Sequence, residues 1–171
     1  MRLVSIFKIL FAVAFGVYAL RGAFVPQSAW LLDGANLLFH EAGHLLFSIL
    51  GEWVSMAGGT LLQLLIPGGL AIAFFCQGQP YSGSVMLMWY GQNFFGISVY
   101  VRDARAQALP LVGGEIHDWG YLLGKAGLLQ QEKSIGGLIW VIGFMIVLIA
   151  MLLCMYQAWI ARLEPSDQQA I

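Results

Sequence analysis

Long runs of apolar residues, separated by short polar or glycine-rich segments, dominate this chain. A membrane-spanning helix takes about 20 mainly apolar residues. The runs that approach or exceed this length are Leu3–Leu20, Trp30–Leu50, Val54–Cys76, Val85–Val101 and Ile135–Ile160. The pattern therefore predicts an all-α fold, a polytopic transmembrane helical bundle of about five spans. A shorter apolar stretch, Tyr121–Leu129, predicts a short re-entrant or interfacial helix before the last span.

The composition supports a membrane environment. Of the 171 residues, 60% are hydrophobic and only 10% are charged, which is not typical of a soluble domain. The net charge is -1 and the chain has no block of basic residues, so we expect no nucleic-acid partner. We expect a multi-pass integral membrane protein whose immediate surroundings are the lipid bilayer.

The first apolar run has two interpretations. Lys8 interrupts it and Arg21 ends it, which favours a retained anchor helix, whereas Gln27-Ser28-Ala29 leaves open a cleaved signal peptide. On the first interpretation the chain divides into an anchor at 1–24, a core at 25–162 and a short polar C-terminal tail at 163–171.

Basic residues near the ends of the runs predict an orientation, since they favour the cytoplasmic side. With five alternating spans and the N-terminus inside, the residues on the cytoplasmic side are Arg2, Arg102, Arg105, Lys125 and Lys133, against Arg21 and Arg162 outside. The second run would then pass from outside to inside.

The second run contains His40-Glu41-Ala42-Gly43-His44. On a helix, positions i and i+4 share a face, so His40 and His44 can bind one metal ion while Glu41 reaches a metal-bound water. This is the pattern of hydrolytic zinc sites, in which the glutamate is the general base. Ionisable side chains are costly within a bilayer and usually mark function there. The pattern predicts a zinc site with His40 and His44 as ligands and Glu41 as the catalytic base.

Local signals support a helix at this motif. Asp33 is a suitable N-cap, and Gly51 can end the helix in a left-handed conformation. Ala42 and Gly43 are small enough to let a neighbouring helix approach closely, although they are also ordinary packing residues. The next run contains Pro67-Gly68-Gly69, which we expect to kink or break its helix.

A third protein ligand must come from another part of the chain. The candidates follow the fourth run and are Asp103, Glu115, His117 and Asp118. We favour His117 as the ligand, with Asp118 beside it either binding the metal or orienting a coordinated histidine. The alternative is an interfacial loop in which Asp118 caps the next helix.

The chain resembles the site-2 protease class of intramembrane zinc metalloproteases, peptidase family M50, and is most similar to its small bacterial members. The resemblance covers most of Trp30 to Ile160 and depends on the histidine motif, the order of spans and the Gln92-Asn93 pair. It implies that Asn93 helps to hold an unwound substrate, although Asn93 could equally form an interhelical hydrogen bond. It also implies Asp118 or Asp103 as the family's metal-binding aspartate. The bacterial inner membrane is the implied location.

Together these features predict an intramembrane zinc metalloprotease that hydrolyses peptide bonds of membrane-embedded substrates. The expected cofactor is Zn2+, and the expected partners are a transmembrane protein or peptide substrate and an adaptor protein that delivers it. One alternative is a zinc-binding membrane scaffold or interaction protein without proteolytic activity. Another is a structural interaction protein that binds no metal.

Overall fold

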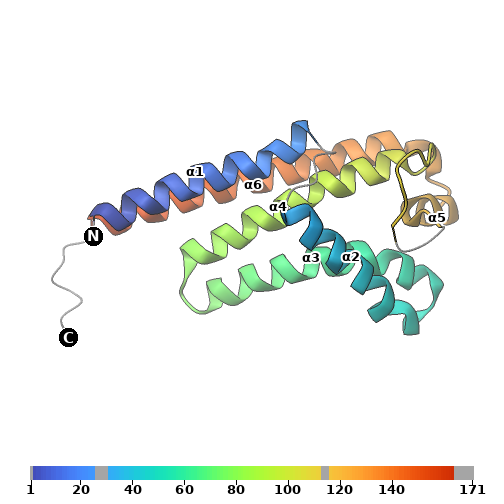
Figure 1. Cartoon of the computed structure of the whole chain (residues 1–171), viewed down its shortest axis with the longest axis horizontal. Coiled ribbons are helices and arrows are strands. Elements are labelled where there is room, and N and C mark those ends of the chain that lie inside the picture. Colours follow the sequence, from blue (N-terminus) through green and yellow to red (C-terminus); the bar gives the residue numbers. More distant parts are fainter. Residues whose placement is uncertain (1, 26–30, 113–115, 164–171) are drawn as a thin grey trace.

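The computed structural model describes residues 2–25, 31–112 and 116–163, and all regular structure in these ranges is helical (Figure 1). The α-helices are α1 (Arg2–Phe24), α2 (Leu31–Phe47), α3 (Glu52–Cys76), α4 (Pro80–Asp103), α5 (Asp118–Lys125) and α6 (Glu132–Leu163). Two short 3-10 helices, Ser48–Leu50 and Leu129–Gln131, precede α3 and α6. The predicted all-α fold is confirmed, and α5 is the expected short helix before the last long one.

Three helices in the described ranges are long and apolar enough to cross a membrane, and they are Leu3–Phe24, Glu52–Cys76 and Leu129–Leu163. This is consistent with membrane association, whereas the expected five spans are not confirmed. Helix α2 has only 17 residues. Helix α4 has 24 residues but carries polar side chains that the other helices bury, among them Ser84, Gln92, Asn93 and Ser98.

Helix α1 packs antiparallel to α6. The indole Nε1 of Trp140 donates to the carbonyl oxygen of Ala23 over 3.0 Å, and Met151 packs against Gly16. Residue numbers therefore rise along α1 as they fall along α6. These two helices and α4 enclose the larger hydrophobic cluster, formed by Ala12, Ala19, Met88, Phe95, Val147, Ala150 and Cys154.

Helix α4 is also antiparallel to α6, and so it runs parallel to α1. Ser98 Oγ donates to the carbonyl oxygen of Gly136 over 2.7 Å, and Ser84 lies near Gln157 at the other end of the pair. Helix α3 runs back along α4, as the packing of Phe75 against Gly83 shows. Helix α4 thus lies between α3 and the α1–α6 pair (Figure 1).

Helix α2 is antiparallel to α3, since His44 contacts Ser55 whereas His40 contacts Gln63. It therefore runs in the same direction as α1. The expected alternation of directions is wrong for these two helices. The start of α1 and the end of α4 consequently lie at opposite ends of the bundle (Figure 1).

Contacts midway along α4 explain why α1 and α2 run in the same direction. Gly22, near the end of α1, packs beside Phe95 and Gln92. At the start of α2, Asn36 Nδ2 donates to Gln92 Oε1 over 2.8 Å, and Gln92 Nε2 donates to Asp33 Oδ1 over 2.7 Å. Helix α2 thus begins where α1 ends along α4 and extends the bundle further, held by amide and carboxylate groups that a bilayer could not solvate.

Three local predictions have mixed outcomes. Asp33 lies inside α2 and accepts a hydrogen bond from Gln92, so the predicted N-cap is wrong. Gly51 does end the motif segment with a positive φ of 97°, but its ψ of 164° is extended rather than left-handed helical. Helix α3 continues through Pro67, so the predicted break does not occur.

Candidate metal centre

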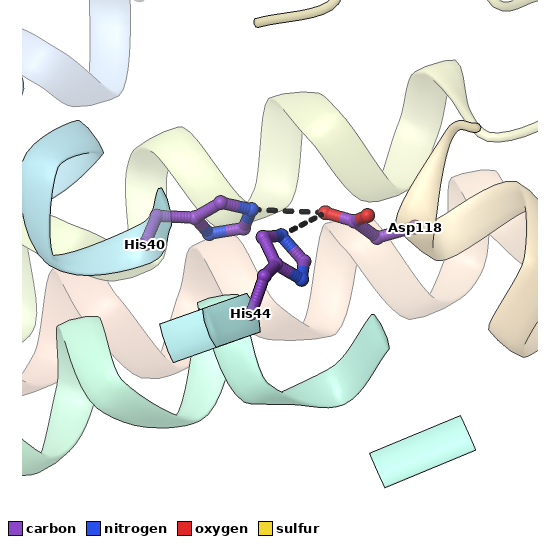
Figure 2. Close-up of side chains that lie close together, drawn as sticks. All are labelled: His40, His44 and Asp118. Carbon is purple, nitrogen blue, oxygen red and sulfur yellow. Dashed lines mark hydrogen bonds and ion pairs between the residues drawn. The ribbon is translucent and has the colours of Figure 1, made fainter. Parts of the chain in front are cut away.

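Two imidazoles and one carboxylate converge at the end of the bundle where α5 lies (Figures 1 and 2). His40 and His44 come from consecutive turns of α2, and Asp118 is the first residue of α5. Asp118 Oδ2 lies 2.9 Å from His40 Nε2 and 3.3 Å from His44 Nε2. Among the described residues, these three form a group whose ligand atoms all lie within 4.8 Å of one another. The structure therefore brings together residues 78 positions apart in the chain.

Asp118 reaches this position because its neighbour caps the helix. His117 is the N-cap of α5, and its Nδ1 accepts the backbone N–H of Gly120 over 3.1 Å. The alternative in which Asp118 is the N-cap of this helix is therefore wrong, because His117 occupies that position. The carboxylate of Asp118 is left free to face the imidazoles at a helix N-terminus, where a negative charge is favoured.

His117 itself faces away from the cluster. Its ring stacks on Tyr100 with centroids 4.1 Å apart, and its Nε2 points to Asp103 Oδ2 at 3.5 Å. Burial lowers the pKa of His117, and the nearby carboxylate of Asp103 offsets only part of that effect. A neutral His117 can accept the Gly120 N–H. Although we favoured His117 as the third ligand, the geometry gives that position to Asp118.

Asp103, a second acidic candidate, does not join the cluster. Asp103 accepts the backbone N–H groups of Ala108 and Leu109, each over 3.0 Å, and so fixes the start of the loop that leads to α5. Glu115 lies outside the described residues. Asp103 thus positions the segment that carries Asp118 rather than contacting the two histidines of α2.

The remaining ring nitrogens of the two histidines contact α3. His44 Nδ1 lies 2.8 Å from the carbonyl oxygen of Ser55, and His40 Nδ1 lies 2.9 Å from Gln63 Oε1. Since a backbone carbonyl can only accept, His44 must carry a proton on Nδ1. Both imidazoles consequently turn Nε2 toward Asp118.

The carboxyl group of Asp118 is held in its ionised form. Burial alone raises its pKa, but hydrogen bonds with His40 and His44 outweigh burial and lower the pKa to about 2. Only 5% of Asp118 is exposed. A buried carboxylate therefore remains charged throughout the neutral range, as a metal ligand must be.

Close contact between α2 and α3 brings the backbone of α3 against the cluster. Gly43 packs directly on the backbone of Gly58, which confirms the predicted close approach at that position, whereas Ala42 is exposed. A Cβ atom placed on Gly59 would lie 2.6 Å from His40 Nε2 and 2.7 Å from His44 Nε2. The cluster therefore fits only because α3 has no side chain at Gly59.

A cleft of about 1020 Å³ opens beside the cluster. Glu41 lines it together with the three cluster residues, and the loop residues 108–112 form another part of its wall. Asn93 also lines the cleft and is 1% exposed. Its Nδ2 donates to the carbonyl oxygen of Trp89 in its own helix, and its buried Oδ1 has no hydrogen-bond partner among the described residues. Asn93 thus keeps a free acceptor at the wall of the cleft, and its hydrogen bond to Trp89 stays within α4.

Sequence reasoning missed the contribution of α3, namely Ser55, Gly59 and Gln63. Gln63 had a recognisable signal, because it is a polar residue within the apolar run Val54–Cys76. The contact of Ser55 is made by its backbone carbonyl and gives no sequence signal.

No protein-family model, curated protein or solved structure matches this chain. The geometry of the cluster and of its cleft therefore provides the basis for inferring function.

Proposed function

We propose that this chain is an intramembrane zinc metalloprotease in which His40, His44 and Asp118 hold the metal. One observation carries the proposal. His40 and His44 both turn Nε2 to one carboxylate oxygen, Asp118 Oδ2, which lies 2.9 Å from the first and 3.3 Å from the second. Without a metal, protons on the imidazoles hold these contacts as hydrogen bonds and ion pairs. A zinc ion would replace those protons, since three ligand-type atoms from α2 and α5 converge on one place.

The donor set suits zinc. Two imidazoles and a carboxylate form a common ligand set of catalytic zinc, and ligands about 2.0–2.2 Å from a tetrahedral ion lie roughly 3.4 Å from one another. The 3.3 Å between His44 Nε2 and Asp118 Oδ2 is close to this value, whereas His40 Nε2 and Asp118 Oδ2, at the hydrogen-bond distance of 2.9 Å, would move slightly apart around an ion. Three protein ligands leave a fourth position for water, as catalytic zinc sites require. Bound zinc would lower the pKa of that water to about 7 and polarise the scissile carbonyl group.

Glu41 is the residue to which we assign the proton transfer. It follows His40 on α2 and lines the same cleft as the three ligands. In the proposed reaction it takes a proton from the attacking water and transfers it to the leaving amine. Asn93 lines the same cleft, and its buried Oδ1, which has no partner among the described residues, would accept an amide N–H of an extended substrate after the side chain turns toward the cleft.

The resemblance to the site-2 protease class extends this proposal to the substrate. The three helices able to cross a membrane support a substrate that is itself embedded in the bilayer, and an adaptor protein is a suitable means of delivery. The bacterial inner membrane is the location that follows from the resemblance.

The experiment compares membranes from cells that express the wild type or Glu41→Ala. Mass spectrometry of new protein N-termini should find membrane-protein fragments in the wild-type sample that are absent from the variant. Glu41→Ala should retain zinc, since Glu41 is not a ligand. Identical N-termini in both samples, with zinc bound in both, would contradict the protease and indicate the zinc-binding scaffold.

A further inference from the structure

Gln63 is an unusual residue for its surroundings. It lies on α3 between Leu62 and Leu64, in one of the three helices able to cross a membrane, and it is 8% exposed. A buried amide group costs free energy unless it is hydrogen-bonded. The partner of its Oε1 is Nδ1 of His40, at 2.9 Å. The amide oxygen of Gln63 is therefore satisfied by one of the two motif histidines.

We propose that Gln63 is a positioning residue for the metal centre. By accepting the Nδ1 proton of His40, it fixes the tautomer in which Nε2 carries the lone pair, and it fixes the rotation of the ring that points Nε2 at the cluster. Outer hydrogen-bond partners of metal-binding histidines commonly have this role. The inference rests on the proposed function only in that the cluster binds a metal.

The two histidines differ in how they are supported. His44 uses a backbone carbonyl, which no substitution of Ser55 removes, whereas His40 uses the side chain of Gln63. The hydrogen bond to His40 Nδ1 can therefore be removed by a substitution of Gln63, without altering a metal ligand. The hydrogen bond can also be strengthened, because a carboxylate at position 63 would accept the Nδ1 proton with a negative charge.

The test uses the full chain in detergent micelles, with Gln63→Met and Gln63→Glu. Methionine keeps the length of the side chain and removes the acceptor, while glutamate keeps the acceptor. Ser84→Ala is the matched control, because Ser84 is buried and the substitution removes its hydrogen bond to Gln157 at the other end of α4 from the cluster. Zinc dissociation constants are measured by competition with a chelator. The exchange of the His40 Nδ1 proton is measured by NMR of zinc-free, 15N-histidine-labelled protein, with His40→Ala used to assign the signal.

We expect zinc to bind about 10- to 100-fold more weakly to Gln63→Met than to the wild type. The protected Nδ1 proton of His40 should also be lost in this variant. Gln63→Glu should restore both the proton and the affinity, and Ser84→Ala should change neither. If Gln63 only filled space in the bundle, glutamate would not restore the zinc affinity and the protected Nδ1 proton that methionine removes.

Two results would overturn the inference. One is a Gln63→Met variant that binds zinc as tightly as the wild type. The other is a freely exchanging Nδ1 proton in the wild type, which is decisive even if Gln63→Met fails to fold. A folded wild type that binds no zinc would instead remove the proposed function, and the Nδ1 proton would still decide whether Gln63 holds His40.

Discussion

Gly59 shows how closely the centre depends on single residues. Its α-carbon faces Nε2 of both His40 and His44, and a side chain there would occupy the space between them. Small residues commonly allow helices in membranes to approach closely. At this position the missing side chain also leaves room for a metal.

Gly59→Ala should therefore lose zinc while the helices stay folded. The added methyl group would lie 2.6 and 2.7 Å from the two Nε2 atoms, so the imidazoles must turn away from Asp118. Gly69→Ala, on the same helix, is the control, since a Cβ atom there would contact no other part of the described structure within 4 Å. Zinc content and circular dichroism of both variants check this, and a fully zinc-loaded Gly59→Ala would contradict the described packing.

The two α2 histidines were predictable from sequence because their spacing on one helix fixes their relation. The third member was not, because His117 and Asp118 are adjacent and either can cap a helix. The choice depends on Asp103 and Tyr100, which contact His117 and turn its ring away from the cluster. Such contacts between distant parts of the chain have no spacing that a sequence pattern can show.

At the scale of elements, α5 is a short helix held by contacts with neighbouring helices and by the loop before it. The indole Nε1 of Trp119 donates to Thr60 Oγ1 over 3.2 Å, which ties α5 to α3. The carboxylate of Asp103 accepts two backbone N–H groups and fixes the loop that leads to α5. Eight residues make a marginal helix on their own, so these attachments determine where Asp118 lies.

Asp103→Ala should loosen that loop and weaken zinc binding by about tenfold, on the scale of other outer partners of metal ligands. The loop should also be cut faster by added protease, because the N–H groups of Ala108 and Leu109 lose their acceptor. Lys125→Ala is the control, since it alters an exposed side chain of α5 itself. Unchanged cutting and unchanged affinity in Asp103→Ala would show that the loop does not position Asp118.

At the scale of the whole molecule, the sequence predicted helices but not their directions. Apolar runs show where helices form and which are apolar enough to face lipid. They do not show that α2 continues in the direction of α1, because that depends on Asp33 and Asn36 bonding to Gln92 midway along α4. The same polar groups explain why α4 lies inside the bundle.

Labelling with a membrane-impermeant thiol reagent tests these directions. The arrangement of helices predicts that Cys76, which is exposed, and a Cys at position 3 (Leu3→Cys) are labelled from one membrane face, and Gln107→Cys from the other. The two substitutions are made in a Cys76→Ser background. Five alternating spans predict instead that positions 3 and 107 share a face. That outcome would contradict the parallel course of α1 and α4.

The central claim is that His40, His44 and Asp118 form a zinc site, and the most direct measurement is zinc per chain in purified protein. The variants are His40→Ala, Asp118→Asn and His117→Asn, the last chosen because asparagine is a favoured N-cap and keeps α5 in place. We predict one zinc per chain in the wild type and in His117→Asn, and loss of zinc in the other two. A folded wild type without zinc, or loss in His117→Asn with retention in Asp118→Asn, would contradict this account.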